Sequence, residues 1–279
     1  MAFSPMRSKA SNHTRSLSLP SKSNPVFAQF EEALSNMRKS ESSCSSILSM
    51  NNSLVGLKHL YSKIDDLLQS THVQQIISRE SHVKLWADRV LDGHITLLDA
   101  CTTAKDHVLL AKQGVQQLLS AVKRKDSDSI RFYLDSRRKS KKMIRKSLKE
   151  SRSIVSRARD GETVNDLACM LNEAELISVK VLESLLTYLI GTNKVQTRWA
   201  LVSKMMSSKK IASCQNEFEK IDVFLQSSSL GDLRVDEEII IMSELKRMDS
   251  SIQNLEEELD CLFRQLIKTR VLLLNLLNN

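Results

Sequence analysis

The apolar residues of this chain recur at alternating steps of three and four, and this rhythm constrains the fold more than any other feature. An α-helix turns once in about 3.6 residues, so this spacing places apolar side chains on one face, which must pack against other helices. The stripes run over four stretches, Ile47 to Leu68, Val83 to Val122, Val164 to Tyr188 and Ile241 to Leu276. The sequence therefore predicts an all-α fold, an elongated bundle of long amphipathic helices with coiled-coil-like packing.

The supply of turn-forming residues supports this fold class. The 279 residues include three prolines, all within the first 25 positions, and six glycines, too few for a sheet-rich domain of this size. The last stripe alone would reach roughly 54 Å as a helix, at about 1.5 Å per residue. A further helix is predicted over Ser207 to Leu225. Bends or helix ends are expected at four glycines, Gly93, Gly161, Gly191 and Gly231.

Two regions divide the chain. Residues 1–24 are rich in serine and basic residues and poor in large apolar groups, so we expect a disordered tail. Asn24 and Pro25 form a helix-start signal, because asparagine caps a first turn and proline has no amide proton to leave unpaired. Residues 25–279 are predicted to form a single helical-bundle domain.

The net charge of +8 is concentrated in one segment. Residues 123–159 hold fifteen cations and four acids, whereas residues 217–279 hold thirteen acids and seven cations. We take the cations of the first segment as a candidate basic surface: Lys123, Arg124, Lys125, Arg137, Arg138, Lys139, Lys141, Lys142, Arg145 and Lys146.

This basic segment allows several interpretations. It can be a solvated helix face that the acidic C-terminal region partly neutralises. It also resembles a bipartite nuclear localisation signal, although import receptors bind such signals extended and this stretch has helical spacing. Binding to an anionic membrane surface is a further alternative. Nucleic-acid binding is disfavoured, because Phe132 and Tyr133 are the only rings nearby and no docking motif accompanies them.

The N-terminal tail contains a phosphorylation motif. Arg15, Ser18 and Pro20 fit the pattern RSxSxP, in which 14-3-3 adaptors bind a phosphoserine. Arg15 stands three residues before Ser18, where a basophilic kinase selects a cation. Phosphorylation adds nearly two negative charges, which an arginine cluster on an adaptor can bind.

The sequence offers no recognisable catalytic, cofactor or metal motif. The six histidines have no recurring ligand spacing, and His94 on an apolar stripe is expected to be a packed core residue. Four acids are expected on solvated helix faces, namely Asp65, Asp66, Asp88 and Asp92. The five scattered cysteines indicate a reducing compartment, each as a small core residue. We predict no enzyme, no cofactor and no metal.

Targeting features are also few. The N-terminus has no apolar signal region, and the longest apolar runs fall short of a bilayer span. We expect a soluble, intracellular protein in the cytoplasm, with the nucleus as an alternative.

Several stretches carry a family resemblance across nearly the whole chain. They include RSLSLPSKSNP in the tail, LKHLYSKIDDLL, RVLDGHITLLDAC, RRKSKKMIRK, VLESLLTYL and the ending LFRQLIKTRVLLLNLLN. In this order they resemble the plant-specific domain-of-unknown-function 241 family, related to the Bypass proteins. Where relatives tend to have a proline after DDLL, this chain reads QSTHVQQ, which affects a helix start.

The resemblance implies an all-helical plant protein without a known catalytic residue, linked through its Bypass relatives to root and shoot development. We therefore predict a non-enzymatic interaction protein with a phospho-regulated tail. The alternative is a peripheral membrane or trafficking factor that binds anionic surfaces through residues 123–159.

Overall fold

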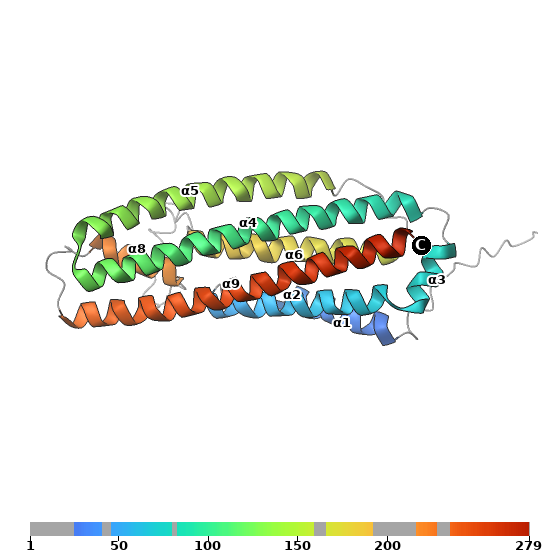
Figure 1. Cartoon of the computed structure of the whole chain (residues 1–279), viewed down its shortest axis with the longest axis horizontal. Coiled ribbons are helices and arrows are strands. Elements are labelled where there is room, and N and C mark those ends of the chain that lie inside the picture. Colours follow the sequence, from blue (N-terminus) through green and yellow to red (C-terminus); the bar gives the residue numbers. More distant parts are fainter. Residues whose placement is uncertain are drawn as a thin grey trace, which may run out of the picture.

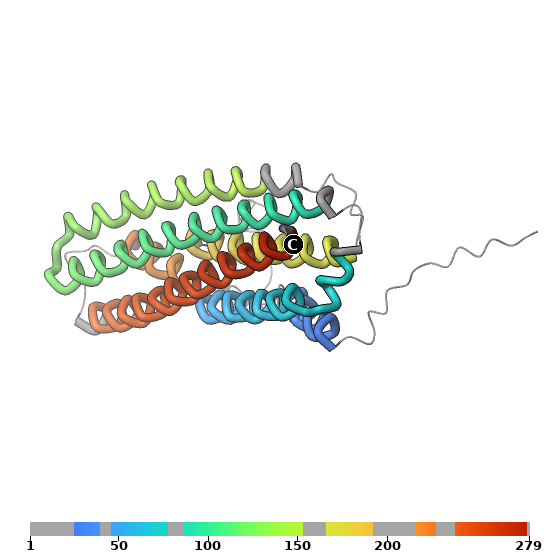
Figure 2. Tube along the Cα trace, turned by 45° about the vertical axis from the view of Figure 1, so that its right-hand side comes forward, coloured from blue at the N-terminus to red at the C-terminus, as the bar shows by residue number. Residues whose placement is uncertain are grey.

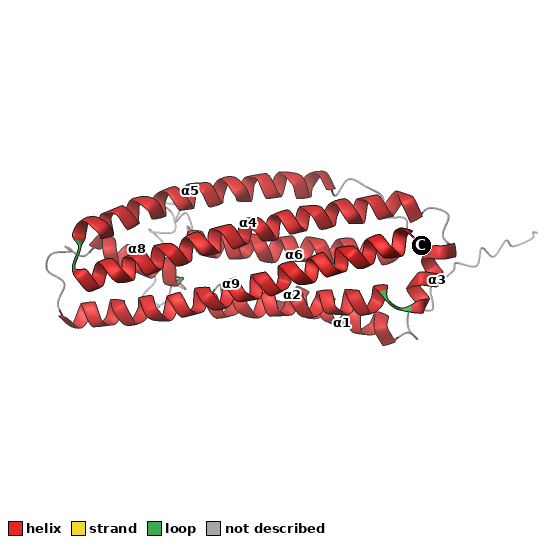
Figure 3. Ribbon diagram, in the orientation of Figure 1, coloured by secondary structure: helices red, strands yellow, loops and turns green. Residues whose placement is uncertain are grey.

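All the regular structure of the described chain is helical. The computed structural model describes residues 25–40, 46–79, 83–158, 166–191, 216–227 and 235–278, and within them it has no strand (Figure 3). The helices are α1 (Pro25–Ser40), α2 (Ile47–Leu68), α3 (Thr71–Arg79), α4 (Val83–Arg124), α5 (Ser127–Ala158), α6 (Asp166–Ile190), α8 (Glu217–Ser227) and α9 (Val235–Asn278). The long helices lie side by side in an elongated bundle, which confirms the predicted fold class (Figure 1).

The longest helix, α9, lies antiparallel to α4. Lys105 on α4 forms an ion pair of 2.6 Å with Asp260 on α9. Earlier on α4, His94 Nε2 lies 2.8 Å from the carbonyl oxygen of Leu266, which comes later on α9. Contacts in this reversed order continue over most of both helices, so the two form the main seam of the bundle.

On its other side α9 lies parallel to α2. Lys58 pairs with Glu258, and Asp65 accepts a hydrogen bond of 2.8 Å from Gln265, so both partners advance together along the chain. In Figure 2, α9 runs between α4 and α2 over the part of the bundle that α2 occupies. The apolar residues of α9 therefore pack against two helices, α4 and α2.

The predicted stripes form the core. In every one of the four stripes the central residues are buried, among them Leu54, Leu57, Leu97, Val108, Leu171, Leu185, Leu255 and Leu259. The third stripe begins at Val164, outside the described residues, and its described part lies in α6. The smaller helix predicted over Ser207 to Leu225 is present as α8, with residues 207–215 outside the described structure.

The structure tests the prediction of bends or helix ends at two of the four glycines. Gly191 ends α6 with a φ of +85°, a left-handed conformation that glycine adopts without a Cβ penalty. Gly93 is not a helix end, because α4 continues through it; the Glu175 carboxylate of α6 lies beside it. Gly161 and Gly231 lie outside the described residues.

A tight turn joins α4 to α5. Lys125 has a φ of +55°, its amide donates to the carbonyl of Val122, and the amide of Asp126 donates to the carbonyl of Ala121. This pair of bonds caps the end of α4. Asp126 then starts α5, because its carboxylate accepts from the backbone amide and the hydroxyl of Ser129, at 3.0 and 2.6 Å. The turn fixes which side of α5 faces α4.

Candidate functional site

The most prominent polar feature of the bundle is the outer side of α5, the outermost long helix in Figures 1 and 2. Ile130, Tyr133, Ile144 and Leu148 are buried against the bundle, so the opposite side of the helix faces solvent. Eight exposed cations lie on that side, and we call them the cationic face: Arg131, Arg138, Lys139, Lys142, Arg145, Lys146, Lys149 and Arg152.

Only part of this charge is paired. The exposed acids of α5 are Asp128, Asp135 and Glu150, so the described exposed side of the helix keeps a net charge of about +5. Arg138 pairs with Asp135 at 2.9 Å, in an exposed geometry that contributes little to stability. Among the described residues, four members of the cationic face form no ion pair, namely Lys139, Lys142, Arg145 and Lys149.

The acidic C-terminal region does not lie across from this face. Acids of α9 pair instead with lysines of α2 and α4, as Glu256 does with Lys112 at 2.6 Å. Of the ten cations that we predicted as a basic surface, Lys125 is paired with α9, through Glu238 at 3.1 Å. Within the described residues, the acidic region therefore pairs with the basic segment in two places, at Lys125 through α9 and at Arg137 and Lys141 through Asp222 of α8.

One predicted surface residue is buried. The Arg137 side chain is only 6% exposed, its Nε lies 3.4 Å from Asp222 of α8, and its guanidinium lies 4.4 Å from the ring centre of Phe218. Lys141 is half-buried and pairs with Asp222 at 2.6 Å. Arg137 thus belongs to the contact between α5 and α8 and not to the basic surface. Its position four residues after the buried Tyr133 was the signal for this.

The other predicted basic residues divide between two helices. Lys123 and Arg124 are exposed in the last turn of α4, and Lys125 is exposed in the turn. Residues 137–146 are helical, whereas an import receptor would need them extended. The tail residues Arg15, Ser18 and Pro20 lie outside the described residues.

Two exposed apolar side chains accompany the cationic face. Phe132 is 66% exposed and Met143 is 52% exposed. They stand eleven residues apart, which is about three helical turns, so they share one side of α5. From the sequence, Phe132 was noted only as a ring near the basic segment and Met143 was missed, although helical phase places both side chains outward.

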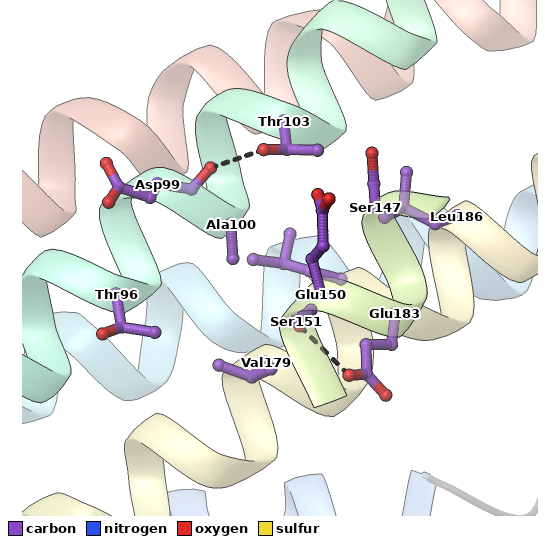
Figure 4. Close-up of a pocket in the computed structure, with 11 residues that line it drawn as sticks. Thr96, Asp99, Ala100, Thr103, Ser147, Glu150, Ser151, Val179, Glu183 and Leu186 are labelled. Atoms are coloured by element: carbon purple, nitrogen blue, oxygen red, sulfur yellow. Dashed lines mark hydrogen bonds between the residues drawn. The ribbon is translucent and has the colours of Figure 1, made fainter. Parts of the chain in front are cut away.

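A cleft of about 190 Å³ lies between α4, α5 and α6 (Figure 4). Its walls carry hydroxyl and carboxylate groups over an apolar floor that includes Val179 and Leu182. The hydroxyl of Ser151 donates to Glu183 at 3.1 Å, and that of Thr103 donates to the backbone carbonyl of Asp99 at 2.9 Å. Both hydroxyls thus have partners within the protein, and among the described residues no histidine, cysteine or basic side chain lines the cleft.

A buried polar group lies deeper in the bundle, where α2, α4, α6 and α9 meet. His94 Nδ1 lies 3.8 Å from the carboxylate of Glu175, and its ring packs edge-on against Tyr61. Burial raises the pKa of Glu175, while the neighbouring His94 opposes this shift. Burial also raises the pKa of the Tyr61 hydroxyl. His94 is therefore a packed and partnered core histidine, as predicted.

Asp65 is a second buried polar group and corrects a prediction. It is 1% exposed, whereas Asp66, Asp88 and Asp92 are exposed or partly exposed on helix surfaces as expected. Its carboxylate accepts from Thr269 at 2.5 Å and from Gln265 at 2.8 Å, and Lys268 lies 2.9 Å away. Asp65 thus links α2 to α9.

The cysteines differ from one another. Cys101 is buried, and burial raises its pKa to about 12. Cys169 is exposed, which contradicts the expectation that each thiol is a core residue. The described residues contain no group of three or more His, Cys, Asp or Glu side chains placed to hold a metal. Within the same residues, no helix combines the length and apolar character needed to cross a membrane.

Comparison with known proteins places the chain in a family. No curated protein and no solved structure matches it. The family model described as Protein BPS1 matches residues 53–276, which include α2 to α9 apart from the first turns of α2 and the last residues of α9. This range covers most of the chain and agrees with the resemblance to the Bypass-related plant proteins. The protein therefore belongs to the BPS1 family.

Proposed function

We propose that this protein is a non-enzymatic regulator of plant root and shoot development that works by binding, and that the cationic face of α5 is its docking surface for an anionic partner. Membership in the BPS1 family supports a regulatory role in plant development. The observation that most supports the docking surface is that four cations of this face form no ion pair among the described residues: Lys139, Lys142, Arg145 and Lys149.

Repulsion among the cations of α5 indicates that the cationic face does not serve the stability of the helix. Like charges three or four residues apart repel one another on a helix, and Lys142, Arg145 and Lys149 stand at these spacings. The face therefore weakens its own helix, while it creates a positive potential that attracts anionic partners. A helix surface that served only solubility and stability would be expected to alternate positive and negative charges, which stabilise a helix at these spacings.

The test compares two triple charge reversals in the full chain. Lys139→Glu/Lys142→Glu/Arg145→Glu reverses the face, and Lys180→Glu/Lys220→Glu/Lys246→Glu changes net charge equally through exposed lysines of α6, α8 and α9. Poly-glutamate serves as the anionic probe. The first variant should lose most of the salt-sensitive binding, and the second should keep it. Equal losses would show that net charge, and not this face, governs binding.

We further propose that the N-terminal tail regulates the protein through phosphorylation of Ser18 and binding of a 14-3-3 adaptor. The support is the RSxSxP pattern formed by Arg15, Ser18 and Pro20. After treatment with a basophilic kinase, the wild-type chain should bind the adaptor and Ser18→Ala should not. Ser23→Ala removes a tail serine outside the RSxSxP pattern and is the control. Unchanged binding by Ser18→Ala would remove the regulatory role.

A further inference from the structure

We infer that the anionic partner of the cationic face is a lipid bilayer, on which the bundle lies lengthwise with Phe132 and Met143 inserted among the headgroups. This inference rests on the proposed function, because it names the partner of the same surface. It adds two apolar anchors and an orientation, neither of which charge alone requires.

The outer side of α5 consists of two adjacent rows of side chains. One row contains mostly cations at helical spacing, with Asp135 as its only acid: Arg131, Arg138, Lys142, Arg145, Lys149 and Arg152. The neighbouring row holds the two exposed apolar side chains, Phe132 and Met143, with Lys139 between them, Lys146 beyond, and the exposed acids Asp128 and Glu150 at its two ends. Cations and apolar anchors thus face the same direction.

The shape of the surface fits a flat partner. The cations extend from Arg131 to Arg152, roughly 32 Å at about 1.5 Å per residue. They lie on the side of α5 opposite its buried residues, and α5 is the outermost long helix of the bundle (Figure 1). The hollow that Phe132 borders lies beside the α4–α5 turn, at one end of the row. A planar anionic surface can contact the whole row at once.

The composition of the face favours lipid over protein. The buried centre of a protein–protein interface is depleted of charged residues, lysine above all, and gathers contiguous apolar groups. Here lysine and arginine fill the face, and its two apolar side chains stand about three turns apart. Isolated large apolar groups among cations are typical of helices that lie in the interface of an anionic membrane.

The test measures flotation of the full chain with phosphatidylcholine vesicles, with and without phosphatidylserine. Binding should require phosphatidylserine and weaken with salt. The variant Phe132→Ser/Met143→Ser should bind about tenfold more weakly, because it loses two inserted side chains. The control Leu48→Ser/Val271→Ser removes two apolar side chains that are similarly exposed, at 67% and 49%, and should bind as wild type.

Poly-glutamate binding separates the two proposals. The Phe132→Ser/Met143→Ser variant should keep wild-type affinity for poly-glutamate, since its cations are intact. If the wild type binds poly-glutamate through the cationic face but does not float with phosphatidylserine vesicles, the bilayer inference is wrong and an acidic protein becomes the partner. Vesicle binding that is unchanged by the double serine variant would also overturn the insertion of Phe132 and Met143.

Discussion

Gly93 of α4 lies against the carboxylate of Glu175 of α6, so closely that a Cβ at position 93 would collide with it. Glycine is here the residue that makes room for a buried acid on another helix. This contact joins residues far apart in the chain.

Replacing Gly93 with alanine should therefore give the opposite result to the usual one. In a helix interior, Gly→Ala normally stabilises by about 1 kcal/mol. Gly114→Ala on the same helix should show that gain, because its nearest neighbour is the Tyr133 ring at an ordinary 3.5 Å. Gly93→Ala should lower the free energy of unfolding in urea, and the double variant Gly93→Ala/Glu175→Ala should lose less than the two single effects combined. Similar gains at both glycines would contradict this.

The adjacent acids Asp65 and Asp66 should differ sharply in their contribution to stability. Asp65→Ala removes the acceptor of Thr269 and Gln265 and should cost about 2–4 kcal/mol. Asp66→Ala removes an exposed pair with Lys63 and should cost about 0.5 kcal/mol or less. Thermal unfolding of both variants checks the difference; comparable losses would mean that Asp65 does not hold α2 to α9.

The neighbouring arginines Arg137 and Arg138 provide a similar pair. Arg137→Ala should cost about 2–3 kcal/mol, because it removes the stacking on Phe218 and one partner of the buried Asp222. Arg138→Ala should change stability by less than about 0.5 kcal/mol, since its pair with Asp135 is exposed. Limited proteolysis should find α8 more accessible in the first variant alone. Equal cleavage of both would place Arg137 outside the α5–α8 contact.

The raised pKa of Glu175 predicts a pH dependence of stability. The folded protein retains this proton at pH values where the unfolded chain has lost it. The contribution of Glu175 is thus present below its usual pKa of 4.5 and is lost as the pH rises through the raised pKa. Relative to wild type, Glu175→Gln should gain stability over that same rise. Urea unfolding across pH measures the gain, with Glu32→Gln on the exposed side of α1 as control. A gain that does not change with pH would refute the assignment.

A single reversal on the cationic face should separate stability from binding. Lys142→Glu places an acid three or four residues from Arg138, Lys139, Arg145 and Lys146, and should stabilise the fold by about 0.5 kcal/mol or more. It should at the same time weaken binding to poly-glutamate. Lys246→Glu on α9 is the control, because it places an acid three residues from Asp249 and should not stabilise. A variant that is both more stable and fully active in binding would argue against the docking role.

The sequence predicted the helices well because their apolar residues follow a fixed period. The same period also distinguishes buried from exposed acids. Asp65 stands four residues after the buried Tyr61 and three before the buried Leu68, so its phase is that of the core. Asp66 is one step further round the helix and is exposed. Charge alone indicated a surface position for both residues, and helical phase distinguishes them.

Other features had no local signal. The close approach of Gly93 and Glu175 depends on how α4 and α6 pack, which no spacing within either helix encodes. Lys125 adopts a left-handed backbone conformation, which lysine rarely does. A glycine at this position would have indicated the turn in the sequence. The partners of the acids on α9 were likewise decided by packing, since α9 lies along α2 and α4.

The place of α9 in the bundle also affects how the chain is made. Both α2 and α4 precede it, and each buries part of its apolar stripe against it. During translation these two helices leave the ribosome well before the segment that covers them, so the nascent chain exposes apolar surface until α9 has been synthesised. Holdase chaperones would find their substrate in that interval, and a premature stop codon within α9 would prolong it indefinitely.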